Sequence, residues 1–158
     1  MLDLLPQAEA RFRALQQRGA AFFGTEMAIL GGAMSWVSER NLVAAISNAG
    51  GFGVIACGAM TTALLEAEIA GTQALTQKPF GVNLITMHPD LDVLVQVCLR
   101  AKVGHIVFAG GIPPGPAIRA ATPPSNVSLA LPGRRTRQGI VAEMSDALSK
   151  MSKLGASK

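Results

Sequence analysis

The chain has no tyrosine, one tryptophan, two histidines and two cysteines among its 158 residues. Cys57 and Cys98 lie in apolar surroundings and are too few for a disulfide framework or a metal site, so we expect two buried thiols of a cytoplasmic protein. With no tyrosine, and with only His88 and His105 for proton transfer, no convincing Ser/His/Asp arrangement is present. No uncharged run is long enough to cross a membrane, and no basic leader precedes an apolar core, so we expect no membrane association.

Charge is balanced in most of the chain and unbalanced at its end. Residues 1–118 hold seven Lys/Arg and eight Asp/Glu, whereas residues 119–158 hold seven and two. A nucleic-acid interface would combine basic with aromatic side chains, and this basic end has no aromatic residue. We therefore expect a solvated tail and no nucleic-acid partner. Hydrophobic residues make up 49% of the chain, which indicates a globular core.

Short apolar runs alternate with helical patterns through the first 121 residues. The runs at 28–30, 53–56, 80–85 and 105–108 predict strands, and helices are expected over 39–49, 62–75 and 91–102. An amphipathic helix over 7–18 precedes them and is expected to cap the bottom of the sheet. Repeated βα units give an α/β fold with a parallel sheet, either doubly wound or a (β/α)8 barrel.

This alternation fails after residue 116. Proline, glycine and arginine interrupt the pattern, and residues 127–131 predict a short strand at best. The apolar residues of 140–154 lie on one helical face, which predicts a closing helix there.

Glycine pairs are the main chemical signal. Gly31-Gly32 and Gly110-Gly111 both follow expected strands, at the carboxyl ends where α/β proteins bind ligands. Exposed backbone amides there could approach a flat ring or a phosphate, although a plain turn explains each pair as well. Asn83 ends an apolar strand, and its buried amide suits a flavin ring edge or a neighbouring backbone group. Met34 could lie against a cofactor ring or fill the core.

The two histidines occupy opposite ends of the expected sheet. His105 opens a strand and so lies at the wrong end for chemistry. His88 follows a strand and is a candidate base or substrate contact, but its Met-His-Pro-Asp context favours a helix-entry turn.

Three motifs carry a resemblance to a known family. They are ILGGAMSWVSERNLVAAISNAGGFGVIACGAMT, KPFGVNLITMHP and HIVFAGGIPPG, in this order over roughly Phe22 to Ala121. Together they resemble the nitronate monooxygenase (2-nitropropane dioxygenase) family, which is related to the flavin-dependent enoyl-ACP reductases. The resemblance implies a TIM-type barrel that binds FMN and oxidises alkyl nitronates with O2 to carbonyl compounds and nitrite. It also implies that Gly32, Ala33 and Met34 lie against the flavin and that Asn83 bonds to it.

Two parts of the family pattern have no counterpart in this sequence. One is its catalytic histidine in a Gly-Gly-His motif, and the other is the set of late glycine loops that hold the FMN phosphate. A full (β/α)8 barrel also needs about 250 residues. We therefore expect a truncated barrel, with about four strands within residues 1–121 and a divergent, irregular basic tail over 122–158. The catalytic residues stay unassigned.

Two other hypotheses remain open. A half-barrel exposes strand edges and apolar surface, so the chain could be a non-catalytic fragment that forms a homo-oligomer through these edges. The chain could also be an enoyl-ACP reductase-like flavin enzyme.

Overall fold

The computed structural model of this chain describes residues 4–121 and 126–130, and the following elements refer to these residues. The helices are α1 (Leu4–Phe23), α2 (Arg40–Asn48), α3 (Thr62–Leu75), α4 (Leu91–Arg100) and α5 (Gly115–Ala121). The strands are β1 (Gly53–Cys57), β2 (Phe80–Ile85), β3 (His105–Ala109) and β4 (Asn126–Ala130).

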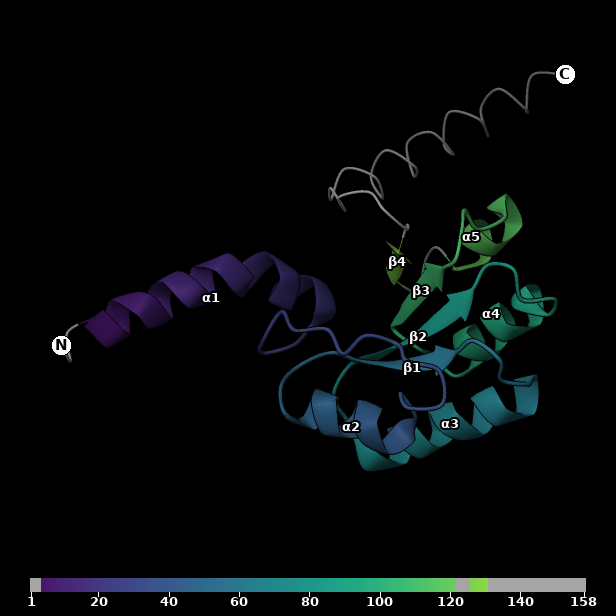
Figure 1. Cartoon of the computed structure of the whole chain (residues 1–158), viewed down its shortest axis with the longest axis horizontal. Coiled ribbons are helices and arrows are strands. Elements are labelled where there is room, and N and C mark those ends of the chain that lie inside the picture. The colour runs from purple at the N-terminus through teal and green to yellow at the C-terminus, as the bar shows by residue number, and fades with distance from the viewer. Residues whose placement is uncertain (1–3, 122–125, 131–158) are drawn as a thin grey trace, which may run out of the picture.

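The four strands form one parallel sheet in the order β1-β2-β3-β4. Chain order is kept across the sheet without a reversal, as in a (β/α)8 barrel and unlike a doubly wound sheet, whose order reverses at a switch point. Helices α2 to α5 follow one another beside the sheet, whereas α1 projects away from it (Figure 1). The predicted α/β fold, a partial TIM-type barrel, is therefore confirmed.

The sheet has a packed outer face and an inner face that is only partly buried along β2 and β3. Ile55, Val82 and Ile106 belong to the buried core shared with α2 to α5. Side chains alternate along a strand, so Asn83, which follows Val82, faces the other side. There it lies in register between Ala56 of β1 and Val107 of β3, on the surface that would face the interior of a complete barrel.

Most of the predicted elements are confirmed, several to within a residue. Helix α3 and strand β2 have the predicted bounds. Thr61 caps α3, because its side chain accepts a hydrogen bond from the backbone N–H of Leu64. Helix α1 is longer than the predicted 7–18.

The predicted strand over 28–30 is wrong in extent, since only a single bridge joins Leu30 to Phe52. The Phe52 N–H donates to Ile29 O, and the Gly31 N–H donates to Phe52 O. Beyond this point the chain leaves the sheet, and the Ser38 carbonyl accepts the Ala56 N–H instead. The edge of β1 is thus covered by a loop and not by a strand.

The end of the described chain contains one element that the sequence analysis missed. Helix α5 lies where the alternating pattern of the sequence ends, and it begins with Gly115-Pro116, which suits a helix start because proline lacks the N–H that would be unpaired there. Strand β4 agrees with the short strand predicted over 127–131. The helix predicted over 140–154 lies outside the described residues.

Candidate functional site

The loops at the carboxyl ends of the strands lie against one another and form one rim. A β-carbon placed on Gly58, after β1, would lie 3.1 Å from Ser35 Oγ and 3.2 Å from Ile85 Cδ1. A β-carbon placed on Gly111, after β3, would lie 3.1 Å from Thr86 Oγ1. The loop over 31–38 and the loops after β1, β2 and β3 therefore share one surface, at the end of the sheet where this architecture binds ligands.

The glycines of the first pair differ in their surroundings. A β-carbon on Gly31 would lie 2.5 Å from Ile46 Cδ1, so Gly31 lets α2 pack closely against the loop. A β-carbon on Gly32 would have no heavy atom within 4 Å. Packing therefore explains Gly31, whereas the backbone at Gly32 is open to an approaching group.

A buried serine holds the loop that contains Gly32, Ala33 and Met34. Ser38 is 3% exposed, and its hydroxyl donates to Gly32 O at 3.1 Å and accepts from the Met34 N–H at 3.0 Å. Ala33 and Met34 are exposed between these two bonds. Ser38 is not identifiable from the sequence, because its partners lie four and six residues away in an irregular loop.

Asn83 is half-buried on the inner face of β2, and its side chain makes no hydrogen bond with the described residues. Its backbone neighbours across the sheet are Ala56 and Val107, neither of which has a polar side chain. Strand β1 separates Asn83 from the loop of Gly32 and Met34. The structure thus places the two predicted contacts on either side of β1, without direct contact between them.

The second glycine pair and His88 have structural roles. Gly110 has φ 88°, a left-handed conformation that favours glycine, and it turns the chain after β3. The Nδ1 atom of His88 accepts from the Asp90 N–H at 3.1 Å, and the His88 carbonyl accepts from the Leu91 N–H. His88 therefore forms the turn that leads into α4, as its sequence context favours.

His105 lies at the opposite end of the sheet, as predicted. Its ring packs edge-on against Phe22 and Phe52, while Phe23 stacks on Phe52 with ring centroids 4.5 Å apart. Its Nε2 atom lies 3.1 Å from the Phe22 carbonyl oxygen. Burial lowers the pKa of His105, which favours the neutral ring. Through this aromatic cluster the end of α1 closes the bottom of the sheet.

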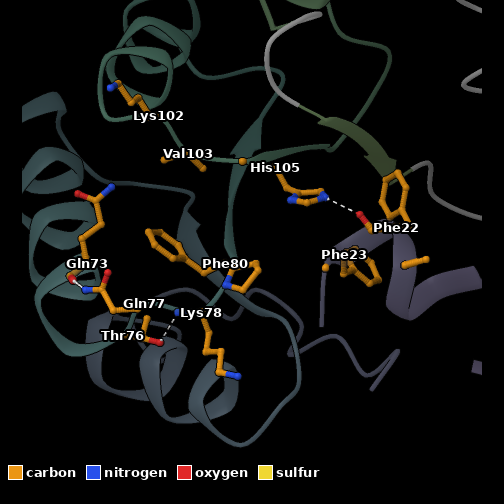
Figure 2. Close-up of a pocket in the computed structure, with 14 residues that line it drawn as sticks. Phe22, Phe23, Gln73, Thr76, Gln77, Lys78, Phe80, Lys102, Val103 and His105 are labelled. Atoms are coloured by element: carbon orange, nitrogen blue, oxygen red, sulfur yellow. Dashed lines mark hydrogen bonds between the residues drawn. The ribbon is translucent and has the colours of Figure 1, made fainter. Parts of the chain in front are cut away.

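A pocket of about 720 Å³ opens beside this cluster, at the amino ends of β2 and β3 (Figure 2). Lys78 and Lys102 are among its polar lining residues. The Lys78 ammonium is 3.1 Å from a Glu26 carboxylate oxygen, and the Gln73 side chain donates to the Ala101 carbonyl. Because Lys78 and Gln73 are already engaged and the pocket faces away from the rim, we assign it no catalytic role.

Neither cysteine offers a nucleophile. Both are free and buried, as the sequence predicts. Burial raises the pKa of Cys57 to about 11 and that of Cys98 to about 12, so both thiols stay protonated. In the described part of the chain there is no cluster of metal-ligating side chains, and no helix long and apolar enough to cross a membrane.

A sequence profile of the nitronate monooxygenase family matches residues 16–104, more than half of the chain. The chain belongs to the nitronate monooxygenase family. A nitronate monooxygenase of Paraburkholderia phytofirmans is 37% identical over 93 residues, which cover 58% of this chain and 25% of that protein. The family predicted from the three motifs is thus confirmed.

This family member is also similar to proteins that are not named nitronate monooxygenases. The (3aS,4S,5R,7aS)-5-hydroxy-7a-methyl-1-oxo-octahydro-1H-indene-4-carboxyl-CoA dehydrogenase of Rhodococcus jostii is 37% identical over 86 residues, covering 54% of this chain and 24% of that protein. FabK from Thermotoga maritima has a TM-score of 0.69 and 37% identity, covering 72% of this chain and 37% of that chain. The chain spans about a quarter of the length of these curated relatives.

Proposed function

We propose that this chain provides the first part of an FMN-binding barrel, and that its site serves the oxidation of alkyl nitronates with O2 to a carbonyl compound and nitrite. One observation carries the proposal: the open backbone at Gly32 and the side-chain amide of Asn83, which has no hydrogen-bond partner among the described residues, flank β1. Family membership supports it.

The residues present fit the ring of the cofactor. The open space at Gly32 admits a flat group close to the backbone, and the exposed Met34 side chain offers an apolar contact. Asn83 has a donor and an acceptor that no described residue occupies, which suits a ring edge carrying both N–H and C=O groups. The late glycine loops that hold the FMN phosphate in the family pattern have no counterpart in this sequence, so the fit concerns the ring alone.

The residues of this chain would act by binding and orienting. When bound, FMN would supply the redox chemistry between the nitronate and O2. Asn83 would hold and polarise the ring edge, and Ser38 would keep the loop of Gly32 and Met34 in place through its two hydrogen bonds. A nitronate is already the deprotonated form of a nitroalkane, so binding it requires no catalytic base, and we assign none.

The test measures retained flavin. The purified chain is mixed with FMN and desalted, and its visible absorption spectrum is recorded. Oxygen uptake in the presence of a nitronate is then measured. Asn83→Ala should weaken FMN binding by about 1–3 kcal/mol, because a polar partner is lost. Gln96→Ala is the matched control, since Gln96 is an exposed amide on α4 without a described bonding partner. Equal affinity of the two variants would remove Asn83 from the site, and a colourless wild-type chain would refute FMN binding.

An enoyl-ACP reductase-like activity is a second candidate. It is favoured by the likeness to FabK at 37% identity and to the CoA dehydrogenases. Bleaching of bound flavin by a reduced nicotinamide, followed by return of the colour when an enoyl thioester is added, without nitronate oxidation, would select it.

Self-association without catalysis is a third candidate. In the described sheet β4 is an edge strand, and an edge strand offers unpaired backbone groups to a second chain. A concentration-dependent mass in light scattering would support this proposal, and a monomer at all concentrations would refute it.

We also propose a cytoplasmic location, since the two free thiols suit a reducing compartment.

A further inference from the structure

Five large apolar side chains stand exposed on the loops of the rim. They are Met34, Trp36 and Val37 before α2, Met87 after β2, and Ile112 after β3. Trp36 is 70% exposed, Met87 78% and Ile112 80%. We call these five residues the apolar rim. Single exposed apolar residues need no explanation, but five of them on neighbouring loops form a patch typical of a binding site.

The contacts between the loops make the apolar rim one surface. Ser35, next to Trp36, and Ile85, at the end of β2, both approach Gly58 after β1, and Thr86, next to Met87, approaches Gly111, next to Ile112. The Thr86 N–H also donates to Ala109 O, which joins the ends of β2 and β3. The three groups of the apolar rim are thus held together at the carboxyl end of the sheet.

Trp36 has an unusual backbone conformation. Its φ is 64°, in the left-handed region that bulky residues rarely adopt. The turn is held because the Val37 and Ser38 N–H groups both donate to Met34 O, and because the Ser38 hydroxyl joins Gly32 to Met34. Strain of this kind usually supports either packing or function. Since the indole is mostly exposed, packing does not account for it.

We propose that the apolar rim binds the apolar body of the substrate, a long alkyl chain, with Trp36 as its main contact. This inference rests on the proposed function, because the reacting group of the same substrate would lie toward Gly32 and Asn83. The side chains of the apolar rim carry no charge, and their polar atoms are limited to the indole N–H and the weakly accepting sulfurs of Met34 and Met87. The site is therefore suited to substrates larger and more apolar than short nitroalkanes.

Trp36 provides its own probe, because the chain contains one tryptophan and no tyrosine. We would titrate the full chain with the nitronates of nitroethane and 1-nitrooctane, with and without FMN, and follow the Trp36 emission. The octyl compound should shift the emission to the blue and bind at least about tenfold more tightly than the ethyl compound, since each buried methylene adds to affinity. Equal affinities, or an unchanged emission, would overturn the proposal.

Variants distinguish the apolar rim from nonspecific adsorption. Met87→Ala and Ile112→Ala should each weaken octyl binding and leave ethyl binding unchanged. Leu75→Ala is the control, because Leu75 is also exposed but ends α3 at the opposite end of the sheet. Equal losses in all three variants would overturn the proposal. So would a Trp36 emission that is already blue-shifted without ligand, because another part of an assembly would then cover the apolar rim.

The same titrations separate this inference from the proposed function. Tighter octyl binding by a chain that retains no FMN would support the apolar rim and refute the flavin site. If the protein retains FMN and binds the ethyl and octyl nitronates with equal affinity, the flavin site is supported and the proposal for the apolar rim is overturned.

Discussion

Replacing Ser38 with alanine removes the hydroxyl that joins the two ends of the Gly32–Met34 loop. The hydroxyl donates to Gly32 O at 3.1 Å and accepts from the Met34 N–H at 3.0 Å, and the side chain is buried. Two neutral hydrogen bonds contribute about 1–3 kcal/mol together. Water can reach the exposed Met34 and replace part of the lost hydrogen bonding. We therefore expect the free energy of unfolding to fall by about 1–2 kcal/mol, near the lower end of this range.

Urea unfolding followed by circular dichroism measures this loss, and the fluorescence anisotropy of Trp36 measures the freedom of the loop. Ser38→Ala should lower both the unfolding midpoint and the anisotropy. Ser35→Ala is the control, since Ser35 is exposed in the same loop and should change stability by less than about 0.5 kcal/mol. If Ser38→Ala matches Ser35→Ala in both measurements, the hydroxyl does not hold the loop and the reasoning is refuted.

Two further predictions concern the scaffold. The Glu68 carboxylate accepts hydrogen bonds from the side chain and the backbone N–H of Arg40, and the side-chain bond is the main cause that lowers the pKa of Glu68. The pair therefore stabilises the fold fully above the ordinary glutamate pKa of about 4.3 and loses this effect as the pH falls through the lowered pKa. Glu68→Gln should cost about 1–3 kcal/mol at neutral pH and flatten the acid dependence of the urea midpoint, and an unchanged pH profile would contradict this. Gly53→Ala would place a β-carbon against the Val43 backbone and should cost about 1–3 kcal/mol in thermal unfolding, whereas Gly104→Ala, with no atom within 4 Å, should be nearly neutral.

Local sequence signals predict much of the fold. The helix over 62–75 needs only its apolar spacing and the Thr61 cap, and the strand over 80–85 needs only a short apolar run between a turn and a polar stretch. Both are properties of neighbouring residues, so both are predicted with the observed bounds. The strand expected over 28–30 depends instead on a partner edge, and there the Ser38 carbonyl takes the Ala56 N–H.

Some features of the candidate site are likewise visible in the sequence, whereas others depend on tertiary contacts. The sequence indicates glycines after strands and an asparagine within one, but the glycines of the pair Gly31-Gly32 are indistinguishable until Ile46 of α2 packs against one of them. The sequence shows a single tryptophan and does not show that it stands exposed in a left-handed turn.

The amino-acid sequence by itself determined the α/β class, the order of the βα units and the family, because these depend on periodicity, caps and motifs within short stretches. Only the tertiary structure decided which glycine is open, which face of the sheet Asn83 occupies, and that Met87 and Ile112 lie at the same end of the sheet as Trp36. The physical reason is that these properties arise from contacts between residues far apart in the chain, which no local pattern encodes.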